Sequence, residues 1–226
     1  MIGPFALACL DMAGTTVRDD GLVDAAFTQA LALVGVAAGT PRFEAAQAYV
    51  LETMGQSKAE VFGALLSPEE AVRATGTFAA AYESMVAEGG ASAMPGAAEL
   101  FAELRARGVS VALTTGFAPS TRDALLGALG WGDLIDLALS PADVGRGRPA
   151  PDMILGAMAR LGVPMAASVA VAGDTLSDLE AGTAAGAGAV IGVLSGAHDR
   201  ATLATGPHTA LVDDIRGLVG ILEAGT

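Results

Sequence analysis

The sequence predicts an α/β fold, in which a parallel β-sheet is covered by helices and interrupted after its first strand by an all-helical segment. From Pro95 onward, short apolar segments alternate with helix-length segments, which is the pattern of a parallel sheet covered on both faces. Residues 24–89, by contrast, contain helical patterns and no convincing strand. We therefore expect these residues to form an insertion in the α/β domain.

The chain begins with an apolar run, Phe5–Leu10, that reads as a buried strand ending at Asp11. Asp19-Asp20 is expected in a solvated turn leading into the insertion, and Asp24 is expected to cap the first helix there. Ser67-Pro68-Glu69-Glu70 is a strong helix start. Gly89–Ser92 is predicted to be a linker. The expected helices of the insertion are Asp24–Val34, Phe43–Thr53, Ser57–Leu66 and Pro68–Glu88.

Helices and strands alternate beyond the linker. The expected strands are Val109–Leu113, Ile135–Leu139, Ser168–Ala172, Ala189–Val193 and Ala210–Val212. The expected helices are Pro95–Arg107, Ser120–Leu129, Pro151–Leu161, Ser177–Ala185 and Asp214–Ala224. The first strand has no partner before Ser92, so the predicted core comprises residues 1–16 and 91–226, and the predicted helical domain comprises residues 17–90.

Composition narrows the class of function. Hydrophobic residues make up 52% of the 226 residues, which is enough to bury a sizeable core. The net charge of −13 argues against nucleic acid or an anionic membrane as a partner, because either would need a basic surface. The single cysteine, Cys9, can form no internal disulfide, and the apolar N-terminus lacks the basic residues of a signal peptide. Both features favour the cytoplasm.

Polar residues follow the predicted strands at the edge where ligands bind in open α/β sheets. A carboxylate at the end of an apolar strand, such as Asp11 or Asp174, is costly unless it is used or paired. Together they would make an anionic oxygen site that favours Mg²⁺. The Gly14-Thr15-Thr16 loop offers backbone N–H groups and hydroxyls suited to a phosphoryl group. Thr114 could hold another phosphoryl oxygen, Gly116 allows close approach, and Arg148 could screen charge.

These residues resemble the motifs of the haloacid dehalogenase superfamily. The matching segments, in chain order, are Asp11-Met12-Ala13-Gly14-Thr15, Thr114-Thr115-Gly116, Arg148-Pro149 and Gly173-Asp174-Thr175-Leu176-Ser177-Asp178. The resemblance implies a Rossmann-like core with an α-helical cap in place of the insertion. It also implies that Asp11 attacks phosphorus to form an aspartyl-phosphate. Mg²⁺ would be held by Asp11, the carbonyl of Ala13 and Asp174, with Asp178 holding waters or orienting the others.

Ala13 departs from the usual phosphatase motif, which has a second aspartate there to protonate the leaving alcohol. Asp-x-Ala-Gly-Thr-Thr instead resembles phosphonoacetaldehyde hydrolase, or phosphonatase, which cleaves a carbon–phosphorus bond after a cap lysine forms an imine with the aldehyde. That lysine lies in a Met-Gly-x-x-Lys segment, and this chain has Met54-Gly55-Gln56-Ser57-Lys58. Lys58 is the only lysine among 12 basic residues. An amine, unlike a guanidinium, can lose its proton and attack a carbonyl.

Val61 is a second departure, because the phosphonatase pattern has a histidine three residues after the lysine. His198 and His208 are expected to lie on the surface or in loops of the core. Three functions therefore stay open: hydrolysis of phosphonoacetaldehyde or a related carbonyl phosphonate, hydrolysis of a small phosphate ester, or sensing of a phospho-ligand without catalysis. The complete set of Asp11, Asp174 and Asp178 speaks against a sensor. A homodimer through the cap is possible by analogy.

Overall fold

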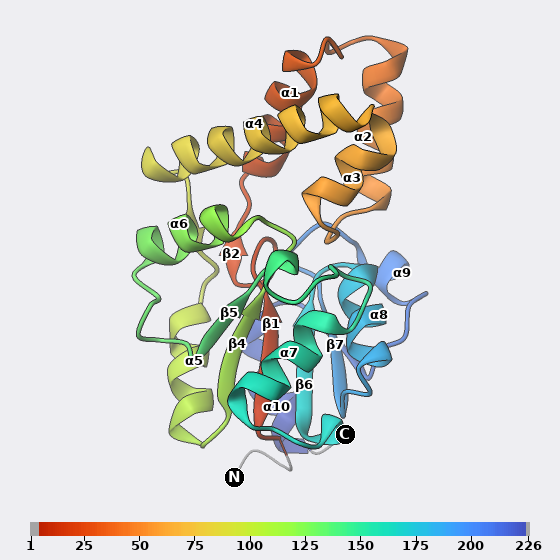
Figure 1. Cartoon of the computed structure of the whole chain (residues 1–226). Coiled ribbons are helices and arrows are strands. Elements are labelled where there is room, and N and C mark those ends of the chain that lie inside the picture. The colour runs from red at the N-terminus through yellow and green to blue at the C-terminus, as the bar shows by residue number, and fades with distance from the viewer. Residues whose placement is uncertain (1–4, 225–226) are drawn as a thin grey trace.

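A computed structural model describes residues 5–224, and its centre is a six-stranded parallel sheet (Figure 1). The strand order is β5-β4-β1-β6-β7-β8. The strands are β1 (Leu7–Asp11), β4 (Ser110–Thr114), β5 (Leu137–Leu139), β6 (Val169–Gly173), β7 (Ala189–Val193) and β8 (Ala210–Val212). The chain builds the sheet outward from β1 in both directions, because β1 pairs with β4 on one side and β6 on the other. The predicted parallel sheet is confirmed.

Helices bury both faces of the sheet. Side chains alternate along a strand, so on β1 Leu7 and Cys9 pack with α7 and α8, whereas Ala8 and Leu10 belong to the larger cluster on the opposite face with α5 and α10. The helices of this part are α5 (Ala97–Ala106), α6 (Pro119–Leu129), α7 (Asp152–Leu161), α8 (Leu176–Ala184), α9 (Arg200–Leu203) and α10 (Leu218–Ala224). Short 3-10 turns are η1 (Pro141–Asp143), η2 (Ala166–Ser168) and η3 (Ile215–Gly217).

The four helices of the insertion lie above the carboxyl ends of the strands (Figure 1). They are α1 (Leu22–Leu33), α2 (Pro41–Glu52), α3 (Lys58–Leu65) and α4 (Pro68–Ala87). Phe27, Phe62 and Phe78 pack together at ring-centroid distances of 4.8 to 6.3 Å and form their apolar centre. Ser67 and Glu70 make the reciprocal capping box expected at the start of α4.

Two details at the entrance to the insertion differ from the sequence-based expectation. The chain crosses through a short antiparallel ribbon, in which β2 (Val17–Arg18) pairs with β3 (Ser92–Ala93), so the expected linker ends in a strand. Asp24 does not cap α1, because the helix begins earlier, after Gly21, and the carboxylate of Asp19 accepts the backbone N–H of Val23 at 3.0 Å. Within residues 5–224, no helix is both long and apolar enough to cross a bilayer.

Candidate functional site

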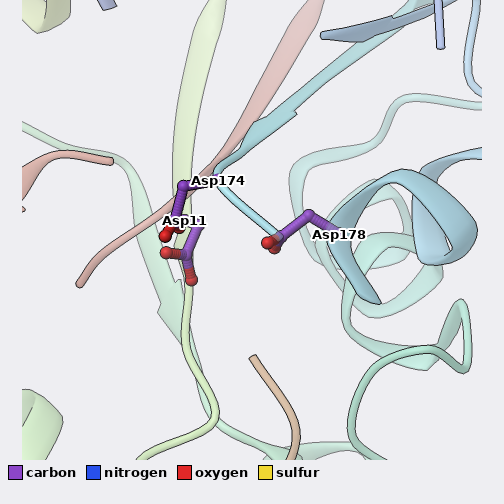
Figure 2. A group of neighbouring side chains, drawn as sticks. All are labelled: Asp11, Asp174 and Asp178. Atoms are coloured by element: carbon purple, nitrogen blue, oxygen red, sulfur yellow. The ribbon is translucent and has the colours of Figure 1, made fainter. Parts of the chain in front are cut away.

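Three buried carboxylates meet at the carboxyl ends of the two central strands (Figure 2). Asp11 is the last residue of β1, Asp174 follows β6, and Asp178 lies in the first turn of α8. One oxygen from each lies within 4.8 Å of the others. Because β1 stands where the strand order turns back, this is the position at which open α/β sheets bind their ligands.

The carboxylate cluster suits a hard divalent cation. Burial, and then the negative charge of Asp11, raise the pKa of Asp174 to about 7, so the site is strained by like charges in the absence of a counter-ion. An all-oxygen donor set of this kind fits Mg²⁺ better than a soft metal. Asp11, Asp174 and Asp178 could therefore hold such an ion, and Ala13 lines the same cavity.

Two loops hold Asp174 in place. One oxygen of Asp174 accepts the hydroxyl of Thr15 at 3.0 Å, and the other accepts the backbone N–H of Ala197 at 2.7 Å. Gly14 is required on the first loop, because its φ is +84° and a Cβ there would lie 2.4 Å from an oxygen of Asp174. The tight turn after β1 thus brings the Gly14-Thr15 segment directly against the carboxylate of Asp174, which follows β6.

Arg148 links the predicted nucleophile to the third carboxylate. Its guanidinium pairs with Asp11 at 2.6 Å and also with Asp178, and all three side chains are buried. Asp178 is further fixed by the backbone N–H and hydroxyl of Thr175, at 3.1 and 2.5 Å. A buried ion pair of this kind holds the Asp11 carboxylate in one orientation.

A cavity of about 500 Å³ opens above these residues, between the sheet and the helical insertion. Of the predicted phosphate-binding segment, Thr115 and Gly116 line it, as do Met54 and Gly55 from the insertion. Thr114 is buried in register with Asp11 and is not among the described residues that line the cavity. The structure therefore places Thr115, rather than Thr114, at the wall of the cavity.

Lys58 is buried at the N-terminus of α3 and lines the same cavity. Its Nζ lies over three phenyl rings, at 5.3 Å from the centroid of Phe27, 5.8 Å from Phe78 and 5.7 Å from Phe117. Burial, and then the positive charge of Arg148, lower the pKa of the Lys58 ammonium to about 8, and nearby carboxylates oppose this shift. At pH 7 about a tenth of Lys58 would then be a free amine, far more than for a lysine with an ordinary pKa of about 10.4.

The segment before Lys58 docks tightly on the core. The hydroxyl of Ser177 donates to the carbonyl of Met54 at 3.1 Å. A Cβ on Gly55 would lie 2.4 Å from the hydroxyl of Thr175, and one on Gly116 would lie 2.4 Å from the carbonyl oxygen of Gln56. Backbone therefore meets backbone here, and the two glycines let the insertion bring Lys58 into the cavity.

Several residues of the site were not singled out from the sequence. Asp19, expected in a solvated turn, is half-buried and lines the cavity. The loop Ser195–Ala197 also lines it, with the hydroxyl of Ser195 donating to the carbonyl of Gly14 at 2.8 Å. His198, expected in a loop, accepts the N–H of Leu176 at 3.1 Å beside this site. The small residues of this loop carry no chemical signature in the sequence, although the loop follows β7 at the ligand-binding edge.

Known proteins resemble this chain in sequence and in fold. Residues 5–186 match the family described as haloacid dehalogenase-like hydrolase. "Probable phosphatase IndB" of Dickeya dadantii is 32% identical over 223 residues, covering 96% of this chain and 94% of that protein. A phosphonoacetaldehyde hydrolase of Parabacteroides distasonis is 34% identical over 107 residues, covering 47% of this chain and 40% of that protein.

The fold is shared with a crystal structure of a hydrolase from Pseudomonas syringae. The TM-score is 0.84 at 24% identity, and the match covers 97% of this chain and 98% of the other. This likeness supports the arrangement of sheet and helices, and the sequence matches extend over most of the chain. Together with the cluster of Asp11, Asp174 and Asp178, they lead to one conclusion: the chain belongs to the haloacid dehalogenase-like hydrolases.

Proposed function

We propose that this hydrolase cleaves the carbon–phosphorus bond of phosphonoacetaldehyde or a closely related carbonyl phosphonate. Asp11 would take the phosphoryl group, and Lys58 would form an imine with the carbonyl. Residues 17–90 would act as a cap domain that carries the lysine, and residues 1–16 and 91–226 as the core that carries the nucleophile. The partial likeness to a phosphonoacetaldehyde hydrolase supports the same reading.

The single observation that carries the proposal is the environment of Lys58. A cap lysine that served only to attract an anion would be expected to lie in contact with solvent, because solvent keeps its ammonium group fully charged. Here the only lysine is buried among three phenyl rings beside Asp11, and its pKa is lowered to about 8. Burial beside other positive charge is the known way of making a lysine nucleophilic at neutral pH.

The chemistry follows from these two side chains. The free amine of Lys58 attacks the aldehyde carbon, water leaves, and a protonated imine forms. A carboxylate oxygen of Asp11 attacks phosphorus, and the electron pair of the carbon–phosphorus bond moves into the imine to give an enamine. The enamine then gains a proton at carbon, and water hydrolyses the resulting imine to release the aldehyde and free Lys58. A second water hydrolyses the aspartyl-phosphate to release phosphate and free Asp11. Because the electrons leave through the imine, Ala13 can replace the aspartate that would otherwise protonate an alcohol.

Asp11, Asp174 and Asp178 are the residues we propose to hold Mg²⁺, together with the carbonyl of Ala13. When bound, the ion would offset repulsion between the anionic nucleophile and the anionic phosphoryl group. Arg148 holds Asp11 in position for attack by its buried ion pair. The hydroxyl of Thr115 and the backbone N–H of Gly116, at the cavity wall, would supply hydrogen-bond donors for the phosphoryl oxygens. Gly14 and Thr15 would support the site through their loop, because their backbone N–H groups donate to Val17 and Met12 and the hydroxyl of Thr15 donates to Asp174.

The second candidate is a phosphatase for a small phosphorylated metabolite, acting on a phosphate ester rather than a phosphonate. Its support is the match to the IndB protein, which covers nearly the whole of both chains. Val61, buried where the phosphonatase pattern has histidine, points the same way. In that case Lys58 would contact the substrate electrostatically, and a water or the substrate would supply the missing acid.

Borohydride trapping separates the two candidates. The protein is incubated with phosphonoacetaldehyde and borohydride, and its peptides are examined by mass spectrometry. We expect a two-carbon adduct on Lys58, and none in the variant Lys58→Arg, which keeps the charge but has no nucleophilic amine. Absence of the adduct in the wild-type protein, together with phosphate release from sugar phosphates, would favour the phosphatase.

A further inference from the structure

We propose that Asp19 is the proton-transfer residue for imine formation at Lys58. It would take the role of the histidine that the phosphonatase pattern has at position 61, where this chain has Val61. This inference rests on the proposed cleavage of a carbonyl phosphonate. Asp19 lies in the connection between β2 and α1, and its side chain lines the cavity together with Lys58.

Imine formation needs three proton movements, and Asp19 takes part in the first and the last. The carboxylate of Asp19 first takes a proton from the Lys58 ammonium, which leaves the free amine and a carboxylic acid. The amine adds to the aldehyde, and a proton moves from nitrogen to oxygen to give a neutral carbinolamine. The acid then gives its proton to the carbinolamine hydroxyl, which leaves as water. The protonated imine and the Asp19 carboxylate remain, so atoms and charge balance.

The other charged residues of the cavity are unsuited to this task. They are Asp11, Arg18, Asp20, Arg148, Asp174, Asp213 and Asp214. Asp11 is paired with Arg148, and Asp174 accepts bonds from two loops. Asp213 and Asp214 are engaged in ion pairs with Arg200 and Arg216. The guanidinium of Arg18 offers only hydrogen-bond donors, and Asp20 is exposed to solvent.

Asp19 meets the requirements that these residues fail. The backbone N–H of Val23 holds one of its oxygens at 3.0 Å, which fixes the carboxylate at the cavity wall. The charges of Asp19 and Lys58 act on each other, and desolvation raises the pKa of Asp19 while it lowers that of Lys58, so the proton affinities of the two groups lie closer together than in water. The titratable groups that interact electrostatically with Asp19 are Lys58 on α3, Tyr82 on α4 and the adjacent Asp20.

The test compares Asp19→Asn with a matched variant, Asp24→Asn. Asparagine keeps an oxygen for the N–H of Val23 but cannot transfer a proton. Asp24 lies in the first turn of α1, the helix that follows Asp19, and is not among the residues lining this cavity. Its variant therefore controls for lost charge near the start of α1. Two rates are measured at saturating Mg²⁺: borohydride-trapped adduct on Lys58 in a single turnover, and phosphate release from acetyl phosphate, whose leaving group needs no acid.

For Asp19→Asn we expect the trapping rate to fall by about 10²-fold, while acetyl phosphate hydrolysis stays within about twofold of wild type. Asp19→Glu should recover part of the trapping rate, which a purely structural role of the aspartate would not explain. Asp24→Asn should leave both rates near wild type. A trapping rate unchanged in Asp19→Asn would overturn the inference, as would an equal fall in both rates. If the wild-type protein forms no adduct, the proposed function itself fails.

Discussion

Asp11 shows how the energetic cost of burying a carboxylate can be offset by a neighbouring positive charge. It lies at the end of an apolar strand, where an unpaired charge would be severely destabilising, and Arg148 compensates it at 2.6 Å. Arg148 also contacts Asp178, so one guanidinium is shared by two carboxylates and balances only part of their negative charge.

Asp11→Asn tests the nucleophile directly. The amide has nearly the same shape but cannot attack phosphorus, so we expect phosphate release from every active substrate to fall by about 10⁴-fold or more. Circular dichroism and thermal unfolding should show a folded chain, since Asp178 still pairs with Arg148. Phosphate release that persists at the wild-type rate would remove Asp11 from its proposed role.

Lys58 makes a prediction about pH. Only the free amine attacks a carbonyl, so adduct formation should increase as the pH rises through the Lys58 pKa of about 8, and should level off above it. A lysine with an ordinary pKa of about 10.4 would keep gaining rate up to pH 10. The measurement is the initial rate of borohydride-trapped adduct between pH 6 and 10, and a rate still rising steeply at pH 9.5 would contradict the lowered pKa.

At the scale of the elements, most strands and helices of the structure could be predicted from the sequence. Apolar runs predict the buried strands, and Ser67-Pro68 with Glu70 predicts the start of α4. The β2–β3 ribbon could not be predicted, because two residues on each strand are too few for any periodicity to appear. The start of α1 was misjudged because Asp19, lying before Gly21, supplies the bond expected from Asp24.

The site could be predicted only where the type and position of a single residue indicate a chemical role. Asp11 and Asp174 stand out as carboxylates at strand ends, Asp178 follows Asp174 within the same motif, and Lys58 stands out as the only lysine. The phenyl rings around Lys58 come from α1, α4 and the loop after β4, so their convergence depends on tertiary packing. Asp19 has the same limitation, since nothing in its own neighbourhood in the sequence points to Lys58.

The docking of the insertion on the core can be tested at Gly55. Alanine there would meet the hydroxyl of Thr175 at 2.4 Å and displace the segment leading to Lys58. Because an error of about 1 Å in positioning can reduce a rate by about 10²-fold, we expect Gly55→Ala to lose at least about tenfold in phosphate release.

Gly39→Ala is the matched control for Gly55→Ala. Gly39 has a similar positive φ, +78° against +85°, but an added Cβ would meet nothing within 4 Å. Both variants should lose about 1–3 kcal/mol of stability from the backbone conformation, measured by urea denaturation, but only Gly55→Ala should lose activity. Equal activity in the two variants would show that the contact at Thr175 does not position the lysine.

For the whole molecule, folding must bring three carboxylates together without a partner for all of their charge. Burial and the proximity of Asp11 raise the pKa of Asp174 to about 7, so assembly of the site opposes folding at neutral pH unless a cation or a proton joins it. Binding of Mg²⁺ to the folded state alone would relieve this repulsion and stabilise the whole chain by mass action.

We therefore expect Mg²⁺ to raise the thermal midpoint of the chelated protein, with a gain in unfolding free energy of about 2.7 kcal/mol at an ion concentration one hundred times the dissociation constant. Asp174→Asn should lose this response, because it removes a carboxylate at the centre of the cluster. Asp123→Asn, which removes an exposed carboxylate paired with Arg122, should keep it. Differential scanning calorimetry in chelator and in Mg²⁺ measures all three proteins. Equal stabilisation of the wild type and of Asp174→Asn would place the ion elsewhere. Stabilisation of the wild type and of Asp123→Asn, but not of Asp174→Asn, would instead place the ion at the carboxylate cluster that includes Asp11.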